Sequence, residues 1–167
     1  PALSATSAAA GETTVTVHHP AESAAGADQV LDWATTALTT YNELFGTYPY
    51  ATLDIVAVPG VTGAEFSGMI LIDEAYVTDP IGAGLRPGAI ELLIAHEVAH
   101  QWWYGMVGSN PQLDTFLDEG LVEYSAIISF ERTHGQDAAR AQVGQGLTLP
   151  YATMLVTSGD FVVDQPA

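Results

Sequence analysis

Two histidines and a glutamate in the middle of the chain have the types and the spacing for metal chemistry. They lie in the sequence His-Glu-Val-Ala-His, as His96, Glu97 and His100. On an α-helix, side chains four residues apart share one face, so both imidazoles can point at one ion, and this is the spacing of zinc ligands. Glu97 lies one step further round the helix, where it can reach a water bound to that ion. The sequence therefore predicts a zinc site in which Glu97 is the general base.

A zinc site with three protein ligands keeps its fourth position for water, so one more ligand is expected. Glu119 supplies it, after the 18 residues 101–118. Turn-forming residues at 108–111 separate the two segments, so a second helix can run back past the first. Glu123 lies four residues after Glu119 and hence on the same face of that helix, where it can accept the outer N–H of a ligating imidazole.

The motif has two competing explanations. Two core histidines with an incidental helical glutamate would show the same residues, but the Asp-Glu-Gly segment at 118–120 would then be a coincidence. A metzincin site would need glycine three residues and histidine six residues after His100. Trp103 and Met106 stand at those positions. The pair of histidines with a distant glutamate is therefore the better explanation.

The segments 96–108 and 116–124, with the gap between His100 and Glu119, resemble the catalytic signature of the M1 family of gluzincin metallopeptidases. Phe116 stands where that family usually has tryptophan. The resemblance implies a peptidase with a single zinc ion. It also implies that His96, His100 and Glu119 bind this ion and that Glu97 activates the zinc-bound water.

Upstream, the segment 62–69 resembles the stretch that binds substrate in the same family. Under this match Glu65 falls on the glutamate that holds the free amino terminus of the substrate in aminopeptidase members, and Gly63 and Ala64 belong to the same substrate-binding stretch. Ala64 and Phe66 depart from the family pattern. An exposed loop carboxylate is the alternative explanation for Glu65.

The resemblance also implies parts that residues 1–167 do not supply. In the family a tyrosine some tens of residues beyond the third ligand stabilises the oxyanion, and Tyr151 is the only tyrosine after Tyr124. Its surroundings lack the family context, so we expect the family's tyrosine to lie beyond Ala167. The family also carries a β domain before and a helical domain after this region. We therefore expect 1–167 to be a single, partial catalytic domain with weak peptidase activity.

Two other functions are open. A zinc-stabilised or metal-free module without catalytic activity would keep the shape of the motif, but it would not need a base at Glu97. A thermolysin-like endopeptidase would have a gap to the third ligand that differs by one residue, and Glu65 would have no amine to bind. Peptides with free and with blocked amino termini distinguish the two peptidase types.

Composition limits the partners. The 167 residues contain 20 acidic residues, three arginines, no lysine and no cysteine, for a net charge of −17. Phosphate backbones and anionic membranes are repelled by such a chain, whereas a peptide ammonium group is attracted. Disulfides and thiolate ligands are excluded. No apolar run reaches the length of a membrane span. The acidity fits a salt-rich or extracytoplasmic setting without selecting a compartment.

Alternating and helical patterns predict an α+β fold with one sizeable core, and the resemblance implies the thermolysin-like gluzincin type of this class. We expect a small mixed sheet whose edge strand, within 62–69, lies beside the helix that carries His96, with a following helix that carries Glu119. Trp102, Trp103 and Tyr104 are expected to extend the first of these helices. The predicted strands are 11–20, 52–58 and 68–73, and the predicted helices are 22–45, 119–134 and 138–144.

Overall fold

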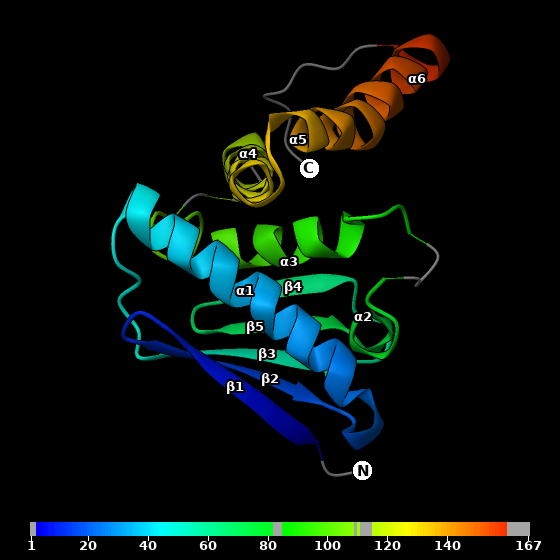
Figure 1. The fold of residues 1–167 in the computed structure, drawn as a ribbon. Helices are drawn as coiled ribbons and strands as arrows, with labels where there is room; N and C mark the ends of the chain where they lie inside the picture. Colours follow the sequence, from blue (N-terminus) through cyan, green and yellow to red (C-terminus); the bar gives the residue numbers. More distant parts are fainter. Residues whose placement is uncertain (1–2, 82–84, 109, 111–114, 160–167) are drawn as a thin grey trace.

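The computed structural model describes residues 3–81, 85–108, 110 and 115–159. Five strands form one mixed sheet in the order β1-β2-β3-β5-β4 (Figure 1). β2, β3 and β5 are parallel, and the two edge strands pair antiparallel with their neighbours. The strands are β1 (Ser4–Ala10), β2 (Thr13–His19), β3 (Thr52–Val58), β4 (Gly63–Phe66) and β5 (Met69–Asp73).

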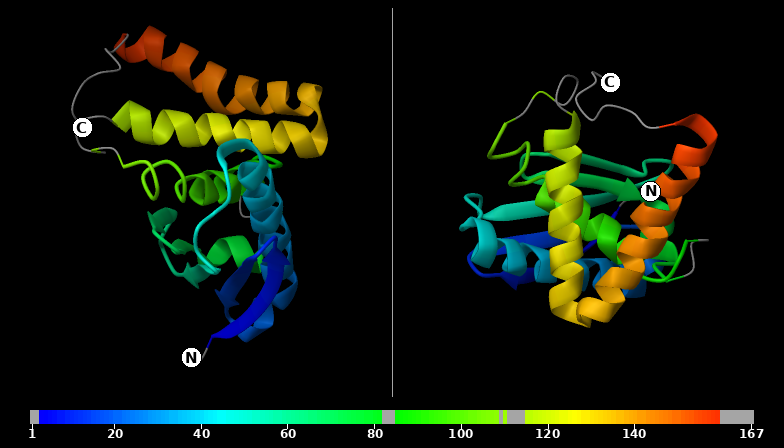
Figure 2. Two further views of the ribbon diagram at one scale, coloured as in Figure 1. Left: turned by 90° about the vertical axis from the view of Figure 1, so that its left-hand side faces the viewer. Right: turned by 90° about the horizontal axis from the view of Figure 1, so that it is seen from above.

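The helices cover one face of this sheet and then build a further layer (Figures 1 and 2). Branched side chains alternate along the strands, so that every second one is buried beneath α1 and α3. α4, α5, η2 and α6 lie beyond α3, on the side away from the sheet. The helices are η1 (Ala21–Ser23), α1 (Ala24–Phe45), α2 (Glu74–Thr78), α3 (Ala89–Ala99), α4 (Thr115–His134), α5 (Gln136–Val143), η2 (Gly144–Thr148) and α6 (Leu149–Ser158).

α3 is buried on nearly every side, which suits a helix that must hold a site rigidly. Ile90, Ile94 and Val98 are at most 3% exposed. The helix packs between α1 and α4, so an amphipathic stripe is not needed. Gly88, at φ 78, lets the chain turn into the first residue of the helix. The chemistry-bearing side chains therefore project from a backbone with little freedom.

The prediction that Trp102, Trp103 and Tyr104 extend this helix is wrong. α3 ends at Ala99, and the chain then makes tight turns in which Tyr104 has a φ of 87. The amide of Gly105 donates to the carbonyl of His100 at 2.9 Å, and a Cβ on Gly105 would lie 2.7 Å from the Gln101 carbonyl oxygen. Because Gly105 has no side chain, its backbone can approach the carbonyl groups of His100 and Gln101 closely, and the chain turns away instead of continuing the helix.

The two ends of the chain carry elements that the sequence did not predict. β1 consists mainly of alanine and serine, which have low strand propensity, and it is held by seven paired positions against β2. η2 and α6 follow α5 almost without a break (Figure 2). Residues 160–167 and part of the predicted turn at 108–111 lie outside the described residues. Within the described residues, no helix is both long and apolar enough to cross a bilayer.

Tyr41 and Tyr48 are buried in this core, and both are expected to resist ionisation. The Tyr41 hydroxyl donates to the Ala95 carbonyl, and the Tyr48 hydroxyl donates to Gln101 Oε1, each at 3.0 Å. Burial raises the pKa of both phenols far above the ordinary value of 10.0. Their neutral forms therefore stabilise the fold fully below pH ~10, the unfolded pKa, and this contribution is lost as the pH rises further.

In an alkaline titration followed by tyrosinate absorbance, we expect one step from the exposed tyrosines. A later absorbance step, from Tyr41 and Tyr48, should coincide with the loss of the circular dichroism signal. Replacing both Tyr41 and Tyr48 by phenylalanine should remove the later absorbance step. A later step that persists in this double variant would contradict the assignment.

Candidate metal centre

His96, His100 and Glu119 converge between α3 and α4. One possible ligand atom from each residue lies within 4.8 Å of those of the other two. His96 Nε2 is 3.2 Å from Glu119 Oε2, and the two imidazole centroids are 5.0 Å apart. Ligand atoms of a tetrahedral zinc site, each about 2.0–2.1 Å from the ion, lie roughly 3.4 Å from one another. The distance between His96 and Glu119 matches this spacing, and the other two pairs lie within 4.8 Å, so the donor types and their convergence suit a zinc ion.

Two further acids contact the outer nitrogens of the imidazoles. His96 Nδ1 lies 3.3 Å from Glu123 Oε2, and His100 Nδ1 lies 3.4 Å from Asp118 Oδ1. Carboxylates in these positions fix the tautomer and the ring orientation of a ligating histidine. The sequence predicts such a contact for Glu123, and its role beside a metal ligand stays a prediction.

The sequence analysis did not predict a contact between Asp118 and a histidine. The side chain of Asp118 is only 3% exposed. Adjacent residues on a helix point in directions that differ by about 100°, so Asp118 can contact one histidine while Glu119 contacts the other. Burial raises the pKa of Asp118; His100 opposes this shift, and Glu119 adds to it. The signal in the sequence was the doubled acid at 118–119.

Electrostatics near His96 favour a positive charge. Burial alone would lower the pKa of this imidazole, but the hydrogen bond with Glu123 and the nearby carboxylates Glu97 and Glu119 outweigh it, so the pKa is raised. A positively charged ion in the same place would experience the same field. The centre is thus prepared for a cation.

Glu97 lies beside the centre with a carboxylate that has no hydrogen-bond partner at Oε2 among the described residues. The residue is 6% exposed. Burial raises its pKa to about 7; His96 opposes this shift, and Glu65 and Glu119 add to it. A carboxylate with a pKa near neutrality is suited to accept and return a proton. A divalent cation alongside would lower this pKa.

The edge strand β4 brings the predicted substrate-binding stretch against α3. Ligand atoms of Glu65, Glu97 and His100 lie within 4.8 Å of one another. A Cβ on Gly63 would lie 2.0 Å from Glu97 Oε1, so the strand approaches this carboxylate as closely as glycine permits. Ala64 is half-buried in the same strand. Glu65 therefore lies in a strand at the centre rather than in an exposed loop.

Gln101 connects this strand to the end of the metal helix. The only sign of this role in the sequence is a polar residue directly after the motif. Its side chain is 1% exposed. Oε1 accepts from the Tyr48 hydroxyl at 3.0 Å and from the Gly68 amide at 2.9 Å. Nε2 donates to the Phe66 carbonyl at 2.9 Å. The β4–β5 hairpin is thus fixed by both ends of one amide.

Replacing Gln101 by alanine should loosen the hairpin and destabilise the chain. The buried Tyr48 hydroxyl and two partly buried backbone groups would lose their partner. We therefore expect the free energy of unfolding to fall by about 3 kcal/mol. Urea denaturation measures the loss, and hydrogen exchange at the Gly68 amide should accelerate. The control is Gln145→Ala, since Gln145 is exposed. An unchanged Gly68 exchange rate in the Gln101 variant would contradict the role.

The other histidines have partners of their own. His18 Nε2 lies 2.7 Å from Asp54 Oδ1 on the outer side of the sheet, whereas His19 is buried and its Nδ1 contacts the Pro20 carbonyl. His18 and His19 thus face opposite sides of β2, as adjacent residues of a strand do. His134 contacts the Glu91 carboxylate at 2.8 Å. None of the three joins a ligand cluster among the described residues.

Comparison with known proteins decides the family. A family model described as "Peptidase family M1 domain" matches residues 29–156. The chain belongs to peptidase family M1. The match covers most of α1, the strands β3, β4 and β5, both helices of the metal centre and most of α6.

Relatives of this M1 chain include three aminopeptidases. Endoplasmic reticulum aminopeptidase 1 of Mus musculus is 32% identical over 114 residues, which make up 65% of this chain and 12% of that protein. Aminopeptidase M1-D of Oryza sativa subsp. japonica is 32% identical over 108 residues, 60% of this chain and 12% of that protein. Puromycin-sensitive aminopeptidase of Caenorhabditis elegans is 31% identical over 99 residues, 56% of this chain and 10% of that protein. The chain thus spans about a tenth of the relatives' length.

Proposed function

We propose that this chain is the zinc-binding core of an aminopeptidase and has the thermolysin-like gluzincin fold. The observation that carries the proposal is the convergence of His96, His100 and Glu119 at ligand spacing, with Glu97 beside them. Membership of peptidase family M1 supports the reaction class. The open α+β sheet with its edge strand at the centre supports the fold type.

The chain's own residues then have distinct tasks. Glu97 accepts the proton of the attacking water and returns it to the leaving amine. Glu123 and Asp118 orient the two imidazoles. Zinc in such a site supplies a Lewis acid that polarises the peptide carbonyl. His96, His100 and Glu119 are the residues that would hold it.

Glu65 supports the choice of an aminopeptidase over an endopeptidase. Its carboxylate lies close to Glu97 and His100 on the strand side of the centre. A free amino terminus is a cation, and a partly buried carboxylate recognises it by a charge-assisted hydrogen bond. Blocking that amine removes the charge, so a blocked peptide leaves Glu65 unpaired.

Two parts of the proposal concern what the isolated chain does. Tyr151 lies on α6, in the layer of helices that is remote from the sheet (Figure 1), and α6 has no buried residue. We therefore expect oxyanion stabilisation, and with it the turnover of the isolated chain, to be weak. The proposed substrate is a peptide.

Zinc analysis and peptide hydrolysis together test the proposal. After dialysis against a zinc buffer, the chain should retain one ion, and it should release the first residue of a peptide with a free amino terminus. The same peptide with an acetylated amino terminus should be cleaved at least ~10-fold more slowly, in line with the loss of one charge-assisted contact. Equal cleavage of both peptides would favour an endopeptidase, and bound zinc without any hydrolysis would favour a non-catalytic module. Failure to retain zinc would refute the proposal.

A further inference from the structure

A cavity of about 160 Å³ lies at the end of the sheet where the parallel strands β2 and β3 begin. The turn between β1 and β2 forms one wall, and the connection from α1 to β3 forms the other (Figure 1). The lining residues are Glu12 and Thr13 of the turn and residues 48–51, Tyr-Pro-Tyr-Ala, of the connection. None of them belongs to a ligand cluster among the described residues. The cavity is therefore separate from the metal centre.

Hydrogen bonds hold both walls of this cavity in place. The Tyr48 amide donates to Asn42 Oδ1, on α1, at 2.7 Å. The Thr13 hydroxyl, on β2, donates to the Tyr50 carbonyl at 3.0 Å. The connection is thus attached to a helix on one side and to a strand on the other. A ligand therefore meets a cavity that is already formed, and little ordering of the chain opposes binding.

Two tyrosine rings form a corner of the cavity. The centroids of Tyr48 and Tyr50 are 5.3 Å apart, and the ring planes are inclined at 75°. Tyr48 is only 3% exposed and also contacts the ring of Trp102, so it is a fixed wall. Tyr50 is 45% exposed and faces solvent. Because the face of a phenol ring carries the negative part of its quadrupole, such a corner attracts a cation.

Glu12 adds a full negative charge to the aromatic corner. The residue is exposed at the tip of the β1–β2 turn, so its carboxylate is accessible from solvent. The chain has three arginines and no lysine, and none of the arginines lines this cavity. The net charge of −17 adds to the local field. The cavity thus combines aromatic rings with a carboxylate and has no positive group of its own.

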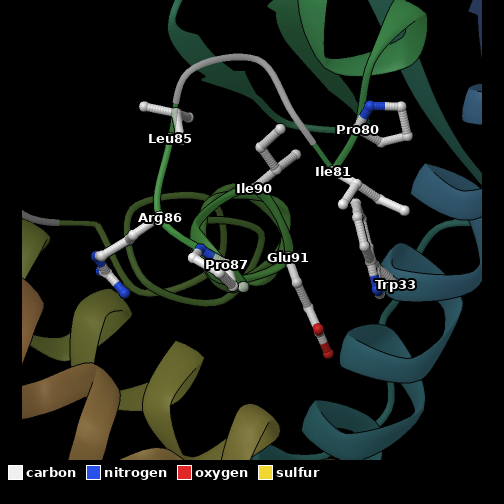
Figure 3. A pocket seen from close by; sticks show the side chains of 9 residues that line it. Trp33, Pro80, Ile81, Leu85, Arg86, Pro87, Ile90 and Glu91 are labelled. Carbon is white, nitrogen blue, oxygen red and sulfur yellow. The ribbon is translucent and has the colours of Figure 1, made fainter.

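Another cavity of the chain does not have this character. It measures about 110 Å³ and is lined mainly by apolar residues beside Trp33 and the start of α3 (Figure 3). Its one carboxylate, Glu91, points away from Leu85 and lies 2.8 Å from His134 Nε2. Arg86 also lines it. A cation would therefore find the acid already engaged and a positive charge nearby.

We propose that the cavity between the β1–β2 turn and residues 48–51 binds an arginine side chain of a partner polypeptide. A guanidinium can stack on a tyrosine ring and can pair with a carboxylate through two parallel N–H donors. Its methylene stem can pack on the exposed ring of Pro49. A lysine ammonium is a strongly hydrated point charge and uses only the charge of the site. The strongly acidic chain thereby recognises a basic segment of another protein.

An NMR titration of the zinc-loaded, ¹⁵N-labelled chain tests this proposal. The probe is the peptide Ac-Gly-Arg-Gly-NH₂, whose blocked amino terminus leaves no ammonium group for Glu65. We expect the amide signals of Glu12, Thr13 and Tyr50 to shift and to saturate. The same peptide with citrulline has nearly the same shape without the charge, and it should bind about 10-fold more weakly. The lysine peptide should also bind more weakly than the arginine peptide.

Variants of the two recognition groups locate the effect. Glu12→Gln should weaken binding of the arginine peptide about 10-fold, and Tyr50→Leu should weaken it about 3-fold. Glu22→Gln is the matched control for the charge, because Glu22 is also exposed. Tyr151→Leu is the matched control for the ring, since Tyr151 is 49% exposed. Both controls should leave binding unchanged, and the amide spectrum of each variant shows whether it is folded.

The contrary outcomes are distinct from one another. Absence of saturable shifts at these amides, equal binding of the citrulline peptide, or full binding by Glu12→Gln refutes the site. Equal binding of the lysine peptide refutes the selection of arginine. If the same amide signals shift when the chain alone is concentrated, the occupant is a second copy, and the proposed foreign partner is wrong. The readout does not involve hydrolysis, so the proposed peptidase function is not tested by it.

Discussion

Replacing Glu97 by glutamine is expected to abolish peptide hydrolysis and to leave zinc uptake intact. The amide has nearly the shape of the carboxylate, but it can neither accept a proton from water nor return one to the leaving amine. Positioned acid–base groups contribute roughly 10²–10⁴-fold, so we expect kcat/KM to fall by about 10³-fold. Without an ion, burial raises the pKa of Glu97 to about 7. A zinc ion alongside would lower this pKa, so that Glu97 is ionised and able to accept a proton near neutral pH.

The metal content separates this role from that of a ligand. Glu97→Gln should bind one zinc ion per chain, as the unmodified chain should, whereas His96→Ala or His100→Ala should lose it. Atomic absorption after dialysis gives the stoichiometry, and circular dichroism shows whether each variant is folded. If Glu97→Gln lost zinc as completely as His96→Ala, Glu97 would be a ligand and its assignment as the base would be wrong.

Gly63→Ala should displace the Glu97 carboxylate, because Gly63 on β4 packs directly against it. The new Cβ would lie 2.0 Å from Glu97 Oε1 and 2.7 Å from its Cδ, so the carboxylate must move. Misplacing a catalytic group by about 1 Å costs roughly 10²-fold in rate. The three atoms nearest to the new methyl group all belong to Glu97, so zinc uptake should be unchanged. Steady-state kinetics and metal analysis on the same preparation measure both.

Gly144→Ala is the matched control for this substitution. Gly144 has helical backbone angles, and a Cβ there meets nothing within 4 Å. The control should therefore retain full activity. Full activity in Gly63→Ala as well would show that Glu97 can occupy another position without cost, and it would refute the close packing of β4 on the base.

Much of this centre was predictable because its residues are related by short spacings in the sequence. His96 and His100 share a helical face by spacing alone, and the contact of Glu123 follows from its distance of four residues from Glu119. The inner strands and α1 were also predictable, since alternation and helical periodicity are strong there. These elements bury their patterned faces, so pattern and structure agree.

Other features could not be predicted, because they depend on contacts between residues far apart in the sequence or on residues with low propensity for the element that they form. Gln101 joins Tyr48, Phe66 and Gly68, which lie 33 to 53 residues away in the sequence. No local pattern reports such a contact. β1 forms from weak strand formers because β2 offers it a complete ladder. After α3 ends, a series of turn hydrogen bonds over residues 100–107 redirects the chain, whereas propensity alone would have continued the helix.

Asp118, Glu119 and Glu123, which contact the imidazoles, lie within one short stretch of α4. His96 lies on the last turn of α3, and His100 is the residue that caps it. The centre is therefore formed by two short helical segments and by the hairpin that carries Glu65. Inserting one residue between Glu119 and Glu123 would rotate the second acid by about 100° and detach it from His96. A protein engineer who grafts this centre onto another scaffold thus needs to reproduce the placement of three small fragments, and the connections between them can be redesigned.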